Sequence, residues 1–250
     1  MRRSMHRFPR GRQTVAMAPL RPDPPLATAV VHGATGYVGG HLVRALLADG
    51  TVVLAVGRSA SRLEALRESA GSDGSRLVTV VADVSTDEGA RQVAQRLDEH
   101  GVVQAAFAAI GGWWEGPHLV DLDTPTWSAL LTSHLTAHFL AARATVPRLD
   151  PEGSAYVAFN GIATLQPEAG SGPVSVTGAG QSMLLDVLRA EDGRSDVRYH
   201  ELCVVNPVVD VGQAVHATEA VVEITDVVAA AVTLARSGDS RTHRQELGRL

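Results

Sequence analysis

A glycine-rich segment near the start of the chain has the residue types and spacing that suit a phosphate-binding loop. Residues 33–39 read GATGYVG, a GxxGxxG pattern that follows an apolar run and precedes a helical pattern. In such a loop one glycine makes a tight turn, another lets the backbone approach a pyrophosphate, and a third lets helix and strand pack closely. The free N–H groups at the start of the following helix also favour an anion. The sequence therefore predicts dinucleotide binding through Gly33, Thr35, Gly36, Tyr37, Val38 and Gly39. The alternative is an incidental glycine-rich turn.

The charges that follow the second apolar run bear on which dinucleotide fits. A site for NAD places an acid there to hold the ribose hydroxyls, whereas this chain has Arg58 and Ser59, with Arg62 one turn later. A guanidinium suits a 2′-phosphate, so NADP(H) is the preferred cofactor and NAD(H) the lesser one; the alternative is a solvated surface arginine. Asp83 and Val84 end the third apolar run, where the acid accepts a hydrogen bond from an adenine amino group.

Composition excludes several kinds of chemistry. The chain has 250 residues, and all 22 of its positive side chains are arginine. Without lysine there is no Schiff base, no P-loop lysine and no tyrosine–lysine proton relay. The single cysteine, Cys203, excludes an intrachain disulfide and lies in an apolar run, which indicates a core position.

Charge is distributed unevenly. The net charge is −5, but residues 1–26 hold six arginines and one aspartate, while the rest has 16 arginines and 26 acids. An acidic body argues against nucleic acid as a partner. No apolar run reaches the length of a membrane span, and the basic start lacks the apolar stretch of a signal peptide. We expect a disordered basic tail over 1–26, a domain over 27–250, no membrane association and a cytoplasmic protein.

Apolar runs alternate with amphipathic stretches along the rest of the chain. Alternation of this kind predicts an α/β fold: a single-domain, Rossmann-like, doubly wound parallel sheet flanked by helices. The continuous Val/Ala/Leu runs are typical of strands buried on both faces. The strands are expected at Ala27–His32, Thr51–Val56, Arg76–Ala82, Val102–Ile110, Ser154–Asn160, Val197–Val205 and Glu246–Leu250. The helices are expected at Gly40–Asp49, from about Ser61, and at Asp87–His100, Leu119–Leu149 (one or two), Thr177–Glu191 and Thr225–Ser237.

From about Ala27 onward the chain resembles the short-chain dehydrogenase/reductase family. The resemblance rests on GATGYVGG, GRSASRLEAL, ADV, the long run from AFAAIGGWWEG to ATVPRL, and NPVVD. The glycine spacing is that of extended and atypical members. The resemblance places residues 108–111, including Ala109 and Gly111, where the family has Asn-Asn-Ala-Gly beside the cofactor. It places Asn206 and Pro207 at the family's Pro-Gly near the nicotinamide.

The resemblance also implies where the family's catalytic asparagine, serine, tyrosine and lysine should be. In the family the tyrosine is the acid/base, the lysine lowers its pKa, the serine orients the carbonyl and the asparagine continues the proton path. The corresponding positions here are His134, Gly161, Val174 and Gly178. No tyrosine or lysine lies between Tyr156 and Tyr199, so shifting the alignment restores neither. The usual mechanism is therefore expected to be absent.

Other side chains stand near these positions. His134 and His138 are four residues apart and share a helix face, and histidine serves as an acid or base near neutrality. Asn160, Ser175 and Thr177 are candidates to orient a substrate oxygen. The alternatives are structural: His134 fills a polar gap, and the two hydroxyls satisfy N–H groups at a helix start. The two histidines lack a third ligand, so no metal site is expected.

Trp113 and Trp114 follow the fourth expected strand directly. Ligands bind at the carboxyl ends of parallel strands, so these rings should overlook the pocket. They form either an apolar wall for a flat substrate or packing for the neighbouring loop.

Three functions remain open. One is an NADP(H)-binding reductase whose catalysis is lost or rewired, acting on a small molecule. Another is a non-enzymatic NADP(H) sensor or inactive partner subunit; a non-redox cyclase or isomerase is a third. The family resemblance further implies a homodimer or homotetramer formed through Leu119–Leu149 and Thr177–Glu191.

Overall fold

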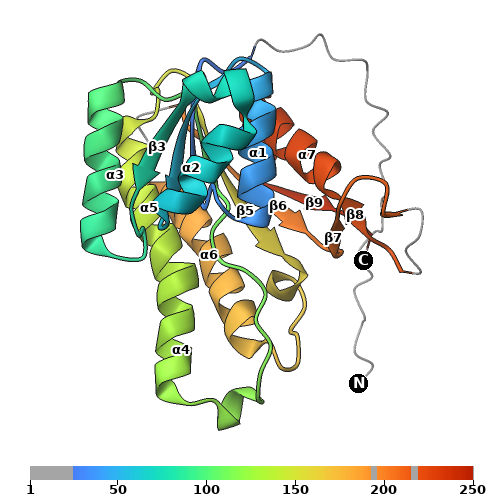
Figure 1. The fold of residues 1–250 in the computed structure, drawn as a ribbon. Helices are drawn as coiled ribbons and strands as arrows, with labels where there is room; N and C mark the ends of the chain where they lie inside the picture. The colour runs from blue at the N-terminus through green and yellow to red at the C-terminus, as the bar shows by residue number, and fades with distance from the viewer. Residues whose placement is uncertain (1–24, 193–195, 215–218, 250) are drawn as a thin grey trace, which may run out of the picture.

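A seven-stranded parallel sheet forms the centre of the molecule, in the order β3-β2-β1-β4-β5-β6-β9 (Figure 1). The computed structural model describes residues 25–192, 196–214 and 219–249, so all but the last two residues of the predicted tail lie outside the described part. The sheet confirms the predicted α/β class and single domain. Its strands are β1 (Thr28–His32), β2 (Val52–Gly57), β3 (Leu77–Val81), β4 (Ala105–Ala108), β5 (Ala155–Gly161), β6 (Arg198–Val204) and β9 (Arg244–Leu247). A separate parallel pair joins β7 (Val208–Val209) to β8 (Val222–Glu223).

Helices cover both faces of the sheet. One face carries α1 (Tyr37–Ala48), α2 (Ala60–Ser69) and α7 (Ile224–Arg236), and the other carries α3 (Asp87–His100), α5 (Ala137–Thr145) and α6 (Gly172–Glu191). Figure 1 shows α4 (Thr124–Leu131) extending past the sheet beside the start of α6. The short helices are Gly71–Arg76, Leu119–Asp121, Val146–Arg148 and Ile162–Thr164, and Thr132–Thr136 forms a π-helical turn.

The apolar runs form the central strands because each one is buried on both sides. All four residues of β4 and five of the six in β2 are buried. Two apolar cores result, one under α1, α2 and α7 and one under α3, α5 and α6. Strand β1 pairs with β2 on one side and β4 on the other. The strand order therefore reverses beside β1, and ligands of open α/β sheets bind at the carboxyl ends of strands at this point.

Helix boundaries differ from those predicted at the helix starts. Helix α1 begins at Tyr37, three residues earlier than expected, because Gly36 is its N-cap. Helix α6 begins at Gly172, five residues earlier, because Pro173 fits the first helical turn, where its missing N–H is not needed.

Two strands also begin or end at other residues than predicted. Strand β4 is shorter than the predicted Val102–Ile110, because Val103 pairs only with Leu149 in an isolated bridge. The last strand lies at Arg244–Leu247 instead of Glu246–Leu250. The predicted helical segment Leu119–Leu149 is divided into α4, the π-helical turn and α5. The pair β7–β8 was missed, since two-residue strands carry no period.

Candidate functional site

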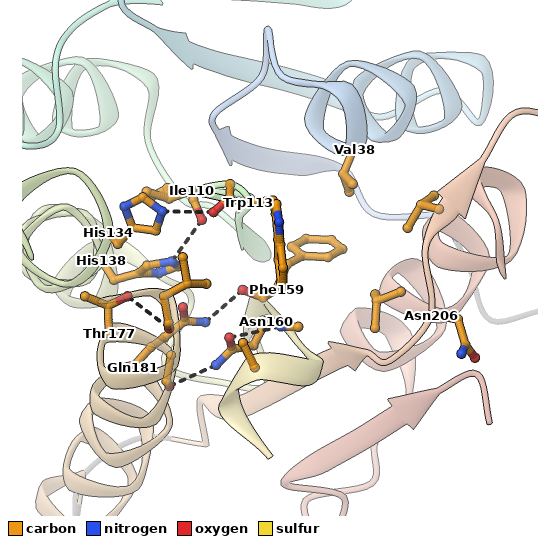
Figure 2. A pocket seen from close by; sticks show the side chains of 17 residues that line it. Val38, Ile110, Trp113, His134, His138, Phe159, Asn160, Thr177, Gln181 and Asn206 are labelled. Atoms are coloured by element: carbon orange, nitrogen blue, oxygen red, sulfur yellow. Dashed lines mark hydrogen bonds between the residues drawn. The ribbon is translucent and has the colours of Figure 1, made fainter. Parts of the chain in front are cut away.

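Two adjoining hollows open at the carboxyl edge of the sheet, beside the strand-order reversal. The groove, of about 400 Å³, is lined by the glycine turn and the ends of β2, β3 and β4. The cavity, of about 240 Å³, lies between β5, β6, the π-helical turn, α5 and α6 (Figure 2). The two hollows share four lining residues, so one elongated ligand can occupy both: Ile110, Gly112, Trp113 and His134.

The glycine turn at the start of the groove leaves no space for side chains at two positions. Gly33 has φ +72°, and a Cβ there would lie 2.1 Å from the Ala109 carbonyl oxygen. A Cβ on Gly39 would lie 2.2 Å from the Gly33 carbonyl oxygen. Gly36 caps α1 without a side-chain hydrogen bond. The first N–H groups of α1 therefore have no helical acceptor and present a site for an anion.

The groove also carries two guanidinium groups. Arg58 and Arg62 both line it, with Thr35 and Asp83. Arg62 donates to the Thr35 carbonyl oxygen at 2.5 Å, which fixes that guanidinium beside the glycine turn. Asp83 accepts from the backbone N–H and the hydroxyl of Ser85, at 3.0 and 2.7 Å. The Asp83 carboxylate and the guanidinium groups of Arg58 and Arg62 thus line the same groove.

Several predicted cofactor residues line the two hollows. The groove includes Gly33, Thr35, Gly36, Arg58, Asp83, Val84, Ala109 and Gly111. Val38 and Asn206 line the cavity. Gly111 has φ +96°, and a Cβ there would lie 2.9 Å from the His134 ring. The strand ends therefore bring together residues that are far apart in the sequence.

Other predicted cofactor residues lie outside both linings. Ser59 caps α2 by accepting from the Arg62 N–H at 3.3 Å. Gly39 acts through close packing, and Pro207 lines neither hollow. The Tyr37 hydroxyl donates to Asp210 at 2.6 Å, which ties the start of α1 to the loop after β7. Burial and this hydrogen bond raise the pKa of Tyr37 to about 12, so its hydroxyl stays protonated.

Both amide atoms of the Asn206 side chain are hydrogen-bonded to the backbone of Arg249. Its Oδ1 accepts from the Arg249 N–H at 2.7 Å, and its Nδ2 donates to the Arg249 carbonyl oxygen at 3.2 Å. A Cβ on Gly248 would lie 2.3 Å from that Oδ1. The Asn206 side chain thus secures the end of the chain after β9 while the residue borders the cavity.

His134 has both ring nitrogens engaged within the protein. Its Nε2 lies 3.0 Å from the Gly112 carbonyl oxygen and its Nδ1 lies 2.9 Å from the Ser133 hydroxyl (Figure 2). A carbonyl only accepts, so Nε2 carries the proton and Nδ1 accepts from Ser133. This arrangement matches the structural alternative for His134, which lies in the π-helical turn.

His138 is buried, and it lies close enough to His32 to affect the pKa of that ring. Its Nε2 donates to the Ile110 carbonyl oxygen at 3.3 Å. Burial lowers the pKa of His138 to about 4, and burial followed by the charge of His138 lowers that of His32 to about 3. Both rings are therefore neutral near pH 7. His32 Nε2 lies 2.8 Å from the Thr145 hydroxyl.

Asn160 belongs to a buried polar network below the cavity. Its Nδ2 donates to Gly178 O at 3.0 Å and to Glu201 Oε1 at 2.8 Å, and its Oδ1 accepts from the Gly161 N–H. Glu201 also accepts from Ser182 at 2.6 Å and pairs with Arg244. Glu201 is 3% exposed, so these partners are what make its burial tolerable.

The two candidate hydroxyls are engaged by backbone groups of α6 and the preceding loop. Thr177 donates to the Pro173 and Val174 carbonyl oxygens at 2.8 and 3.2 Å. Ser175 accepts from the Glu168 N–H at 3.2 Å and does not line the cavity. Both contacts are made within the protein, but neither satisfies an N–H group at the start of α6 as the structural alternative predicted: Thr177 donates to carbonyl oxygens, and Ser175 accepts from the preceding loop.

The position of Gly178 is closed to a side chain. A Cβ there would lie 2.3 Å from Thr164 Oγ1 and 3.0 Å from Asn160 Oδ1. A Cβ on Gly161, by contrast, would meet only the Val204 carbonyl oxygen within 4 Å among the described residues, at 3.8 Å. Val174 lines the cavity as an apolar side chain. A long side chain at residue 178 would require Thr164 to move.

Sequence reasoning missed Gln181 in the cavity wall. Gln181 is 5% exposed and donates through Nε2 to the Phe159 carbonyl oxygen at 2.9 Å. It stands seven residues after Val174, and a spacing of seven residues puts two side chains on one helix face. That spacing was the available signal.

The two tryptophans both border the groove. Trp113 is 61% exposed and lines groove and cavity together. Trp114 also lines the groove. Its ring packs so closely on Gly116 that a Cβ there would lie 2.4 Å from the nearest ring atom. Trp113 thus forms part of the wall, and Trp114 also packs on its own loop.

Three smaller findings complete the site. Within the described ranges, no three His, Cys, Asp or Glu side chains are grouped as metal ligands would be. Cys203 is buried, and burial raises its pKa to about 12. None of the helices seen in the described part is long and apolar enough to cross a bilayer.

Comparison with known proteins gives matches over most of the chain. The model of the family described as short chain dehydrogenase matches residues 27–220. An uncharacterized oxidoreductase of Staphylococcus haemolyticus is 24% identical over 131 residues, which cover 52% of this chain and 55% of that relative. The match therefore spans about half the length of that relative.

Solved structures share the fold at low sequence identity. The L-sorbose reductase of Gluconobacter frateurii, solved with NADPH and L-sorbose, has a TM-score of 0.79 at 18% identity, covering 90% of this chain and 96% of its own. The alcohol dehydrogenase of Thermococcus sibiricus, solved with 5-hydroxy-NADP, has a TM-score of 0.75 at 19% identity, covering 88% and 95%. At this identity the likeness concerns the fold.

Proposed function

The chain belongs to the short chain dehydrogenase family, and we propose that within it the protein binds NADP(H) without carrying out the family's usual carbonyl–alcohol redox reaction. When bound, the cofactor of this family supplies or accepts a hydride. Binding and proton transfer depend on different parts of the site. The groove supports the first, and the cavity lacks what the second requires.

The groove fits a dinucleotide by its backbone. Gly33 and Gly39 bring strand and helix so close that a Cβ at either position would overlap a carbonyl oxygen. Gly36, the N-cap of α1, lines the groove, and the N–H groups that follow it would hold the pyrophosphate. Asp83 has one carboxylate oxygen beyond its bonds to Ser85, and this oxygen would accept from the adenine.

The charge of the groove supports NADP(H) over NAD(H). Arg58 follows directly after β2, where an NAD site would carry an acid. Arg62 stands one turn later and is fixed by the Thr35 carbonyl oxygen. Two guanidinium groups would pair with a 2′-phosphate, whereas a ribose hydroxyl would give them little.

The cavity is unsuited to the family's proton transfer. Its tyrosine and lysine positions are Val174 and Gly178, and Thr164 occupies the space beside Gly178. The donors that remain are committed, since His134, Asn160 and Thr177 each bond to protein atoms. The observation that carries the proposal is this closure of residue 178 by Thr164 Oγ1.

Titration with four cofactors and a turnover assay test the proposal together. We expect NADPH and NADP+ to bind more tightly than NADH and NAD+, measured by calorimetry. With NADPH and a panel of aldehydes and ketones, we expect no consumption above the rate without protein. Failure to bind any of the four would refute the cofactor assignment. Sustained NADPH consumption would instead show that the cavity catalyses reduction.

A rewired reductase is the second candidate, favoured by the contact between the two hollows. His134 lines both of them, so this residue is the candidate to supply a proton at their junction. Its two bonded nitrogens argue against that role. If turnover is observed, His134→Ala decides the matter: an unchanged rate removes this histidine from the mechanism, and a large loss assigns it.

We also propose that the protein self-associates through α5 and α6. Along α6 the outward residues Val176, Met183 and Val187 are 43%, 60% and 41% exposed, and Phe139 of α5 is 46% exposed. An apolar stripe of this kind is typical of a contact between subunits. Light scattering is expected to give a dimer or tetramer, and Met183→Arg should lower the mass toward the monomer. A wild-type monomer would contradict this.

A further inference from the structure

The inner wall of the cavity holds two side chains whose hydrogen-bonding capacity the protein leaves partly unused. Gln181 of α6 is 5% exposed and His138 of α5 is 2% exposed. Both line the cavity, on the same side as His134 and Thr177 and opposite Val38 and Asn206 (Figure 2). Polar atoms of side chains this buried are ordinarily paired, so an unpaired atom that reaches the cavity is available to a ligand.

The partner of each bonded atom establishes what the unused atom can do. Gln181 Nε2 lies 2.9 Å from the Phe159 carbonyl oxygen, and a carbonyl only accepts. The amide orientation is thereby fixed, and Oε1 remains as an acceptor. By the same reasoning His138 Nε2 carries its proton toward the Ile110 carbonyl oxygen, which leaves Nδ1 with a lone pair. Neither Oε1 nor Nδ1 has a partner among the described residues.

The other described residues that line the cavity include no acidic side chain and no arginine. Of the 17 described residues that line the cavity, none is an aspartate, glutamate or arginine. The largest contributors are apolar or aromatic, among them Ile110, Phe159 and Trp113. Glu201 lies nearby, but its carboxylate is paired with Arg244 and Ser182. An ion placed in the cavity would lose its hydration without gaining a counter-charge.

We propose that the cavity binds a small, uncharged, largely apolar molecule that carries an O–H or N–H donor, which Gln181 Oε1 and His138 Nδ1 accept. This inference rests on the proposed function, since it assigns the second ligand of the NADP(H)-binding site. It makes Gln181 a specificity-determining residue. The donor of the bound molecule points toward the α5–α6 wall.

Three single-ring probes of similar size test the chemistry at pH 7. Phenol has a donor, toluene has the same shape without one, and benzoate carries a charge. Affinities for the full chain are measured by ligand-observed NMR, with and without saturating NADPH. We expect phenol to bind about tenfold more tightly than toluene, and benzoate not to bind. Toluene is the more apolar molecule, so burial alone would produce the reverse order. Equal or tighter binding of toluene, or binding of benzoate, would overturn the inference.

A variant pair assigns the effect to the residue. Gln181→Met keeps the length of the side chain and removes both the Oε1 acceptor and the Nε2 donor to the Phe159 carbonyl oxygen. Gln92→Met makes the same change on the exposed face of α3, where Nε2 donates to Glu88. We expect Gln181→Met to bring phenol down to the affinity of toluene, with NADPH affinity unchanged, and Gln92→Met to alter neither. If Gln181→Met keeps the phenol preference, Gln181 is not the acceptor and the inference is wrong.

NADPH titration of the same samples separates this inference from the proposed function. Binding of NADPH without a phenol preference overturns the ligand class alone. A phenol preference without NADPH binding supports the ligand class on its own evidence while it refutes the cofactor. The three wild-type probes require no substitution, so they decide the question even if Gln181→Met does not fold.

Discussion

The groove and the cavity meet at Ile110 and Trp113, but their polar groups are used in different ways. In the groove the Arg58 guanidinium has no partner among the described residues, and Gly36, the N-cap of α1, also lines the groove, beside helix N–H groups that have no helical acceptor. In the cavity His134, Asn160 and Thr177 give their hydrogen bonds to the protein itself. Unused donors suit a ligand that arrives with charge, whereas committed donors stabilise the fold.

This difference indicates that binding and chemistry can be separated within one site. The glycine turn depends on backbone geometry, which tolerates almost no substitution at Gly33. Proton transfer depends on individual side chains, and these can be replaced while the sheet stays intact. The polar network of Asn160, Glu201 and Arg244 shows how such a replacement is secured, because each member now satisfies another.

The largest effect is expected at the glycine turn. Gly33→Ala would place a Cβ 2.1 Å from the Ala109 carbonyl oxygen at φ +72°. We expect a loss of about 2–4 kcal/mol in the free energy of unfolding and no measurable NADPH binding by calorimetry. Gly50→Ala is the matched control, since Gly50 has φ +88° with nothing within 4 Å. It should cost about 1–2 kcal/mol and leave binding intact; equal effects would contradict the role of close approach.

Acid should destabilise the protein through the buried histidine of the cavity. The pKa of His138 is lowered to about 4 in the folded protein, so below pH 6.5 the unfolded chain takes up protons that the folded one does not. Stability contributed by the neutral ring is therefore complete above pH 6.5 and is lost as the pH falls through 4. The loss is on the order of 3 kcal/mol.

Urea unfolding at several pH values between 7 and 4 measures this loss. His138→Gln keeps a donor for the Ile110 carbonyl oxygen and removes the titration, so its unfolding free energy should depend less on pH. The control is His100→Gln at the exposed end of α3, which should follow the wild type. Identical pH profiles for His138→Gln and the wild type would disprove the assignment.

Restoring a lysine tests whether the cavity is closed to the family's chemistry. Gly178→Lys would meet Thr164 Oγ1, so we expect a loss of about 1–3 kcal/mol in stability. Thr164→Ala removes that contact, and the double variant should recover most of the loss in a thermal melt. Ala179→Lys, at an exposed position on the same helix, should cost little. If the single variant were as stable as the wild type, the closure argument would fail.

The smallest expected effect concerns the choice of dinucleotide. Arg58→Ala should weaken NADPH binding about tenfold and leave NADH binding nearly unchanged, since only NADPH carries the 2′-phosphate. Arg96→Ala on α3, where the side chain pairs with Glu99, controls for the change in net charge. Equal losses for both dinucleotides would move Arg58 away from the 2′-phosphate.

Much of the fold was predictable from periodicity. Apolar runs identified β1, β2 and β5, because strands buried on both faces are mainly apolar. Strand β6 was also predicted, although it contains Arg198, His200 and Glu201. Boundaries failed where capping and pairing decide. Pro173 extended α6 backward, and β4 is shorter than predicted because its pairing with both β1 and β5 ends at Ala108. The family and its fold are confirmed, while the site residues and the NADP(H) preference remain predictions.

The sequence by itself determined the glycine turn, the arginine after β2 and the absence of tyrosine and lysine from the catalytic positions. These are properties of residue type and short spacing, which no folding alters. Only the tertiary structure decided how the remaining polar groups are used. Asn160 meets Glu201 across 41 residues and Gly178 meets Thr164 across a loop. A hydrogen bond depends on distances of a few ångströms, and such distances exist only once the strands and helices are packed.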